Sequence, residues 1–161
     1  MNISTSDLCD QFSEKLQVAS PVLRHYGGVS RFHGKIVTIK CYEDNSYIRE
    51  VALENGNGKI LVIDGGGSLR SALVGDGIAT WALNSGWSGI IINGCIRDSQ
   101  ALAKVKIGVM ALGINPWQPS KRNEGLRNIA VTFADVFFRP DEYLWADEDG
   151  FVTSAENLII P

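Results

Sequence analysis

The chain has 161 residues, of which 45% are hydrophobic and 20% are charged, and its formal net charge is −3. These values are typical of a globular protein, and we expect one domain over residues 1–161. The acidic balance and the lack of a basic stripe argue against direct nucleic-acid binding, and no apolar run approaches the ~20 residues of a membrane span.

The amino-terminal residues lack the basic and apolar regions of a signal peptide. The three cysteines, Cys9, Cys41 and Cys95, have no metal-site spacing and predict reduced thiols. We therefore expect a cytoplasmic protein.

Predicted helices and strands follow one another along the first two thirds of the chain. Leu8, Phe12 and Leu16 recur at helical spacing and predict a short amphipathic helix over residues 5–17. The other predicted elements are a strand at 34–41, a helix at 45–56, a buried strand at 59–64, a helix at 69–85, a buried strand at 89–94, a helical turn at 99–104 and a strand at 107–113. The succession of strand, helix and strand between residues 59 and 94 predicts a βαβ unit with two parallel strands.

The last third of the chain has a different pattern. Residues 129–154 are rich in β-branched and aromatic side chains, with turn signals at 139–141 and 149–150, and they predict several short strands. We therefore expect an α/β domain with a mixed sheet and a β-rich C-terminal half.

Three adjacent glycines follow the buried strand in the sequence DGGG, residues 64–67. Between a strand and a helix, such a loop can hold a small anion, either a carboxylate or a single phosphate, with its backbone amides and with Ser68. The order fits neither the dinucleotide fingerprint nor the Walker loop. The alternative is a tight turn that needs glycine only for its backbone conformation.

Asp76 is an unusual residue within the predicted helix 69–85. It shares the apolar face with Ala72 and Ala79, where an unpaired carboxylate is costly, and it stands between Gly75 and Gly77. One interpretation is a functional carboxylate; the other is a helix that breaks near Gly75, so that Asp76 caps a second segment.

The strand GIIINGCI ends in Arg97 and Asp98. Neighbouring side chains on a strand point to opposite sides, so this dipeptide is a weak structural ion pair. Ligands of α/β sheets usually bind at the carboxyl ends of strands, where Arg97 could hold a carboxylate and Asp98 a hard cation such as Mg²⁺ or Mn²⁺. A solvated polar turn explains the pair equally well.

Two further polar segments have weaker patterns. The loop at 120–125, SKRNEG, could be a lid or only a solvated loop, and one carboxylate of the acidic turn 147–149 could reach a neighbouring subunit. The four tryptophans are most simply core or interface residues.

Four stretches together closely resemble a known family: VIDGGGSLRSALVGDGIA, GIIINGCIRDSQAL, IGVMALGINPWQPSKRNEG and YLWADEDGFV. The family joins the regulator of ribonuclease activity A to the class II 4-hydroxy-4-methyl-2-oxoglutarate aldolases, and the resemblance covers essentially the whole chain. Its aldolase members carry an aspartate, twenty residues and then Arg-Asp, a spacing that Asp76, Arg97 and Asp98 match.

The resemblance implies a swivelling β/β/α domain that assembles as a homotrimer with sites between subunits. The implied reaction is retro-aldol cleavage of 4-hydroxy-4-methyl-2-oxoglutarate to two pyruvates, with decarboxylation of oxaloacetate as a related activity. A divalent cation, Mg²⁺ or Mn²⁺, would stabilise the enolate as a Lewis acid. No lysine lies at an apolar strand end, where a Schiff base would form.

The resemblance also assigns roles. Asp98 would hold the cation, Arg97 would bind substrate and steady the enolate oxygen, and the segment Gly75-Asp76-Gly77-Ile78 would bind the substrate carboxylate through its amides. Asp76 would also orient a water for proton transfer. The alternative function is that of the family's regulators, which bind and inhibit an endoribonuclease. The residue that completes the metal site from a neighbouring subunit is unassigned.

Overall fold

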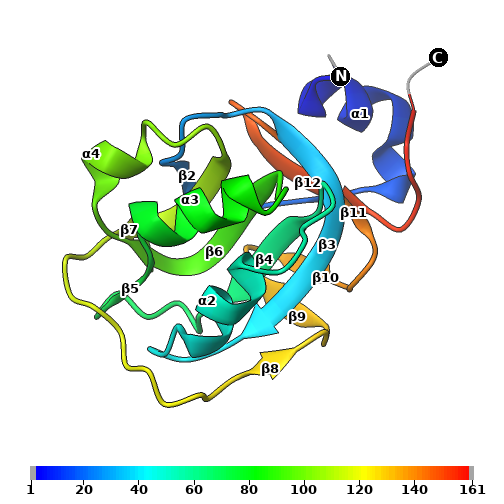
Figure 1. Ribbon diagram of the computed structural model, residues 1–161. Helices are drawn as coiled ribbons and strands as arrows, with labels where there is room; N and C mark the ends of the chain where they lie inside the picture. The colour runs from blue at the N-terminus through cyan, green and yellow to red at the C-terminus, as the bar shows by residue number, and fades with distance from the viewer. Residues whose placement is uncertain (1–2, 160–161) are drawn as a thin grey trace.

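Four parallel strands form the centre of the sheet in the computed structural model, which describes residues 3–159 (Figure 1). They are β3 (Phe32–Lys40), β4 (Ile60–Asp64), β6 (Gly89–Ile96) and β7 (Gly108–Ile114), side by side in that order. Their buried positions are almost all aliphatic, as expected of parallel strands covered on both faces. Every connection between neighbours contains a helix, which confirms the predicted βαβ unit and adds two more.

Antiparallel strands extend this sheet on both sides. The β3 edge continues through β11 (Tyr143–Asp147), β12 (Gly150–Ser154) and β1 (Gln17–Val18), and β7 pairs with β2 (Arg24–His25). The short strands β5 (Ala72–Val74) and β8 (Leu126–Arg127) pair with β6 and β3, and β9 (Val131–Phe133) forms a separate hairpin with β10 (Val136–Phe138). The mixed sheet is large and curled, and its C-terminal half is β-rich, as predicted.

Helices cover one face of the sheet and the β9–β10 hairpin covers the other (Figure 1). The helices are α1 (Thr5–Phe12), the 3₁₀ turn η1 (Ser13–Lys15), α2 (Ser46–Ala52), α3 (Asp76–Asn84) and α4 (Ser99–Leu102). One apolar core lies between the sheet and α2, α3 and α4, and a second lies under the hairpin. A third, smaller cluster packs α1 on β11 and β12.

The predicted helix 69–85 is wrong in its first half. Residues 72–74 form β5, which pairs with the end of β6 in the register Ala72↔Cys95, and the helix begins only at Asp76. Pairing with residues distant in sequence overrides the local helical pattern here. The alternative of a break near Gly75 is therefore confirmed, but its cap at Asp76 is wrong, because Gly75 takes the N-cap position and Asp76 is the first helical residue.

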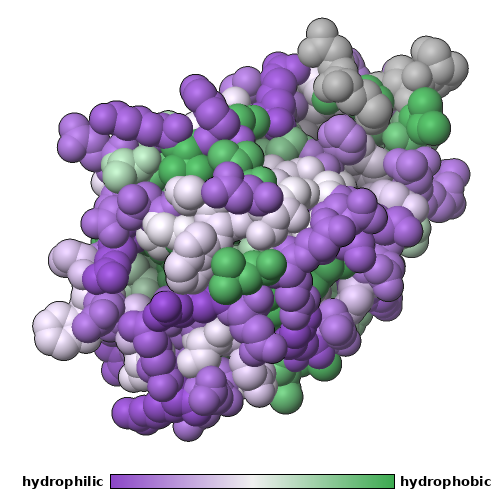
Figure 2. All heavy atoms as spheres, in the orientation of Figure 1, coloured by the Kyte–Doolittle hydropathy of each residue, from purple (hydrophilic) through white to green (hydrophobic). Residues whose placement is uncertain are grey.

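The face that carries α2, α3 and α4 is mostly hydrophilic or neutral, with hydrophobic residues scattered in small groups (Figure 2). None of the helices within residues 3–159 is long and apolar enough to cross a membrane.

Candidate active site

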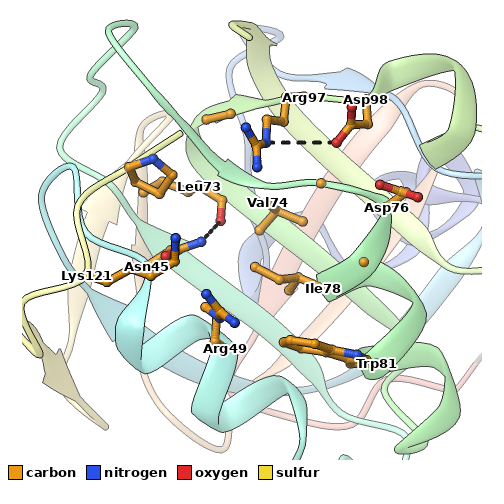
Figure 3. Close-up of a pocket in the computed structure, with 14 residues that line it drawn as sticks. Asn45, Arg49, Leu73, Val74, Asp76, Ile78, Trp81, Arg97, Asp98 and Lys121 are labelled. Atoms are coloured by element: carbon orange, nitrogen blue, oxygen red, sulfur yellow. Dashed lines mark hydrogen bonds and ion pairs between the residues drawn. The ribbon is translucent and has the colours of Figure 1, made fainter. Parts of the chain in front are cut away.

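A cavity of about 220 Å³ opens where β5, α3 and the end of β6 meet α2 (Figure 3). It brings together all of the residues predicted for the site and adds others from α2 and from the β7–β8 loop. Its lining consists of Asn45, Arg49, Ala72, Leu73, Val74, Gly75, Asp76, Gly77, Ile78, Trp81, Arg97, Asp98, Pro119 and Lys121.

Arg97 and Asp98 lie together on one wall of this cavity. β6 ends at Ile96, and the Arg97 amide donates to the Val74 carbonyl at 3.0 Å. Asp98 then adopts the left-handed conformation with φ 54°, which aspartate tolerates better than most residues. The two side chains consequently lie near each other, with Arg97 Nε 3.9 Å from Asp98 Oδ2. At that distance, with both groups partly exposed, the ion pair is weak and leaves both groups available to a ligand.

The amino terminus of α3 forms the floor beside this pair. Gly75 is the N-cap and Asp76 the first helical residue, and no side chain caps the first turn. The first amides of a helix have no intrahelical acceptor and carry a partial positive charge, so this turn can accept a carboxylate. A Cβ on Gly75 would stand 3.2 Å from Asp98 Oδ2 and 3.5 Å from Arg97 Cγ. The helix start and the Arg-Asp pair are thus so close that a side chain at position 75 would press on both.

We expect Gly75→Ala to lower kcat/KM about tenfold, because its methyl group displaces the Asp98 carboxylate by a few tenths of an ångström. Gly113→Ala is the matched control, since Gly113 lies in β7 outside the cavity and a Cβ there would meet only Cys95 Sγ, at 3.9 Å. This control should keep its activity and gain slightly in stability, because glycine weakens a strand relative to alanine. Steady-state kinetics and thermal melting of both variants measure the two effects. Equal activity losses in the two variants would contradict the assigned contact.

The opposite wall comes from α2 and was missed in the sequence. Asn45 is buried, and its amide nitrogen donates to the Leu73 carbonyl at 3.2 Å. That bond fixes the orientation of the amide, and its Oδ1 is left without a donor among residues 3–159. Arg49 lies over the Trp81 ring, with Cζ 5.5 Å from the centroid. The wall therefore offers one unsatisfied acceptor and one cation to a ligand.

Lys121 reaches the cavity from the β7–β8 loop, which Asp44 fastens to the start of α2. The buried Asp44 carboxylate accepts hydrogen bonds from the amides of Ser46 and Arg122, and the Ser120 amide donates to the Glu43 carbonyl. Burial alone would raise the pKa of Asp44, but these amide donors hold it below its usual value. The predicted lid or solvated loop is thus tied to the cavity rim.

The DGGG loop lies outside the cavity, which overturns its interpretation as an anion cradle. Asp64 is buried and accepts from the Gly66 amide at 2.9 Å and from Asn93 Nδ2 at 3.0 Å. The Gly67 amide donates to the Asn93 carbonyl, and β5 rather than a helix follows. Gly66 and Gly67 have φ of 67° and 73°, so the alternative of a tight turn that needs glycine is the correct one.

Asp64→Ala should lower the free energy of unfolding by roughly 1–3 kcal/mol, because it removes the charged acceptor of two part-buried hydrogen bonds, from the Gly66 amide and from Asn93 Nδ2. Urea unfolding followed by circular dichroism measures the change, with exposed Asp10→Ala as the control. Activity per folded molecule should stay unchanged. Normal stability with a raised KM would instead restore the anion-cradle role.

The acidic turn 147–149 is largely occupied within its own chain. Asp147 is buried and accepts from the amide and the hydroxyl of Thr5, at 2.6 and 2.8 Å. Glu148 pairs with Arg31 at 2.9 Å, which lowers its pKa to about 2. The buried Asp147 is thus held within its own chain, whereas Glu148 is in an exposed, weak ion pair and stays, with Asp149, a candidate for contact with a neighbouring subunit.

The donors around Asp98 suit a hard, hydrated cation. The Asp98 side chain is exposed and caps no helix, although it precedes α4. Within residues 3–159 no group of three His, Cys, Asp or Glu side chains could enclose a metal ion. Mg²⁺ commonly binds through one or two carboxylates and keeps water or substrate oxygens in its other positions. The residues present therefore fit a water-rich Mg²⁺ or Mn²⁺ site and not a closed structural one.

Comparison with known sequences shows similarity over nearly the whole chain. The sequence profile of a family described as "RraA-like: Aldolase/RraA" matches residues 5–153. A protein of Dechloromonas aromatica is 51% identical, with 98% of this chain and 99% of that protein aligned. One of Laribacter hongkongensis is 49% identical, with 99% and 100% aligned. Both are provisionally named 4-hydroxy-4-methyl-2-oxoglutarate aldolase.

Two solved structures have the same fold. The RNA-processing inhibitor RraA of Thermus thermophilus superposes with a TM-score of 0.95 and 36% identity, covering 99% of this chain and 96% of the other. A Geobacillus kaustophilus structure, described as an S-adenosylmethionine:2-dimethylmenaquinone methyltransferase, has a TM-score of 0.94 and 42% identity, with 97% of each chain covered. With the profile match and the relatives near 50% identity, these similarities show that the chain belongs to the RraA-like family.

Proposed function

We propose that this protein is a divalent-cation-dependent carbon–carbon lyase that cleaves 4-hydroxy-4-methyl-2-oxoglutarate to two pyruvates and also decarboxylates oxaloacetate. The observation that carries the proposal is the single cavity that joins Arg97, Asp98 and the uncapped start of α3. The names of relatives about 50% identical agree with it.

Both reactions leave the same product fragment, the enolate of pyruvate. The amides of Asp76, Gly77 and Ile78 would bind the carboxylate next to the keto group. Arg97 would then face the keto oxygen, where negative charge develops as the carbon–carbon bond breaks, and would stabilise that charge. A cation held through Asp98 would supply Lewis-acid polarisation at the same oxygen.

The opposite wall supplies groups for the other end of the substrate. Arg49 and Lys121 would attract its second carboxylate, and Asn45 Oδ1 would accept a hydrogen bond from the 4-hydroxyl or from a water beside it. Asp76, with a water, would take the hydroxyl proton and return one to the enolate carbon. The aldol cleavage is then balanced: one proton leaves oxygen and one reaches carbon.

The cavity's size and charge favour a small diacid over the methyl donor named for the Geobacillus protein. Its volume of about 220 Å³ is below the roughly 300–1,000 Å³ of sites for drug-sized ligands. Its three cations, Arg49, Arg97 and Lys121, outnumber its two carboxylates and complement a dianion.

Product analysis tests the proposed reaction. Purified protein with Mg²⁺ or Mn²⁺ should release two pyruvates for each 4-hydroxy-4-methyl-2-oxoglutarate consumed, measured with lactate dehydrogenase. Release of less than one pyruvate per substrate, or no consumption above the protein-free rate, would overturn it.

We further propose a homotrimer in the cytoplasm, with a neighbouring subunit completing the cation site. Within residues 3–159, one chain brings only Asp98 and the nearby Asp76 to the cation side of the cavity, which supports a contribution from elsewhere. Light scattering with size-exclusion chromatography measures the assembly; a monomer that retains full activity would contradict this part.

A second candidate function is binding to an endoribonuclease. It is supported by the similarity to an RNA-processing inhibitor, which extends over 99% of this chain. A pull-down with the endoribonuclease, repeated with inactive Asp98→Asn protein, would show whether binding occurs and whether it is independent of the cavity. No binding at micromolar concentrations would count against it.

A further inference from the structure

A second, larger cavity of about 760 Å³ lies where β3, β4 and β6 begin, at the opposite end of these strands from the candidate active site. Its polar lining comes from His33, Lys35, Asn57, Lys59, Ser88, Tyr143 and Asn157. No aspartate or glutamate lines it within residues 3–159, although acidic residues outnumber basic ones in the chain. This groove is therefore locally basic on an acidic protein.

Two lysines of the groove are neighbours across parallel strands. The register Ile36↔Ile60 places Lys35 beside Lys59, and a Cβ on Gly34 would stand 3.4 Å from the Lys59 Cα. Neither lysine forms an ion pair with any of residues 3–159. Like charges placed side by side on a sheet are destabilising, and an anion bound between the two lysines would relieve their repulsion.

Aromatic side chains line the same side of the sheet. Lys35 Nζ lies 5.7 Å from the Tyr143 ring centroid, and His33 pairs with Trp145 on β11. Trp145 is buried, and its Nε1–H has no acceptor among residues 3–159. With Arg31 and His33 it lines an adjoining cavity of about 160 Å³. The groove thus continues into a region that also has a hydrogen-bond donor to spare.

We propose that this groove binds a small organic phosphate, with Lys35 and Lys59 bridging its phosphate oxygens. Lysine acts as a point charge that suits phosphate, and Asn57 and Tyr143 can both donate hydrogen bonds, whereas the Ser88 hydroxyl already donates to the Gly58 carbonyl at 2.7 Å. The volume lies within the range of sites for nucleotide-sized ligands, and Tyr143 offers a flat apolar surface to the organic part.

Calorimetric titration with inorganic pyrophosphate and with ADP tests the proposal. The double variant Lys35→Ala/Lys59→Ala should weaken binding at least about tenfold. Lys104→Ala/Lys106→Ala removes the same charge from exposed lysines outside both cavities and should bind as the unaltered protein does. Tighter binding of ADP than of pyrophosphate would show that the organic part contributes; equal binding would assign recognition to the phosphates.

Three further readouts place the bound anion. Binding should persist in Arg97→Ala, which removes the guanidinium of the candidate active site, and should weaken with added salt. The Lys35→Ala/Lys59→Ala protein should melt no lower than the unaltered protein, because it loses a like-charge repulsion, and should keep its lyase activity. No binding of either probe, binding unchanged in the double variant, or binding lost in Arg97→Ala would overturn the proposal.

Discussion

Replacement of Asp98 by asparagine should lower lyase activity by at least about 10³-fold and abolish its response to Mg²⁺. An amide of the same shape cannot supply the anionic oxygen that a hard cation requires. Asparagine is also a better test than alanine here. Asp98 has φ 54°, a conformation that asparagine adopts readily and alanine does not, so Asp98→Asn preserves the backbone.

Asp141→Asn is a matched control for this variant. Asp141 is exposed, has φ 69° and lies outside the cavity, so it undergoes the same chemical change in the same backbone conformation. Its activity should equal that of the unaltered protein, and both variants should melt as that protein does. A Mg²⁺ response retained in Asp98→Asn would show that another group holds the cation.

Arg97→Lys is expected to lower kcat for oxaloacetate about 10²- to 10³-fold with little change in stability. Lysine keeps the charge but loses the planar, forked donors that can face an oxygen and a carboxylate together. Stability should change little because the ion pair with Asp98 that this substitution disturbs is weak, at 3.9 Å between partly exposed groups.

The Arg139–Glu142 pair provides the comparison, because it is similarly long at 3.7 Å and lies outside the cavity. Arg139→Lys should leave both kcat and KM unchanged. If Arg97→Lys raised KM alone, Arg97 would bind substrate without stabilising the developing charge, and the mechanism above would need another group for that role.

The central architecture was predictable because it depends on local patterns. The aliphatic runs of β4 and β6 and the helix between them are sufficient to predict parallel pairing. The start of α3 was not predictable from the sequence. Residues 72–74 have a helical local pattern, and they are extended only because they pair with Cys95 and Ile96. That long-range pairing also moves the start of the helix, and with it the proposed carboxylate site, from Ser68 to Gly75.

The residues of the candidate site were likewise predictable only in part. Arg97 and Asp98 were visible as charges at a strand end, but sequence alone left a polar turn equally acceptable; the left-handed turn at Asp98 is what brings them together. Asn45 and Arg49 had no sequence signal at all. Their proposed role rests on the packing of α2 beside α3 and on an unsatisfied oxygen that only the fold reveals.

The most direct test of the account is oxaloacetate decarboxylation by the purified protein, followed with and without a chelator. Free Mg²⁺ with oxaloacetate and no protein is the blank, and Asp98→Asn protein with Mg²⁺ is the second reference. The account predicts a rate well above both, lost on chelation and restored by excess Mg²⁺. A rate no higher than the blank, or one that the chelator leaves unchanged, would contradict a cation-dependent lyase site at Arg97 and Asp98.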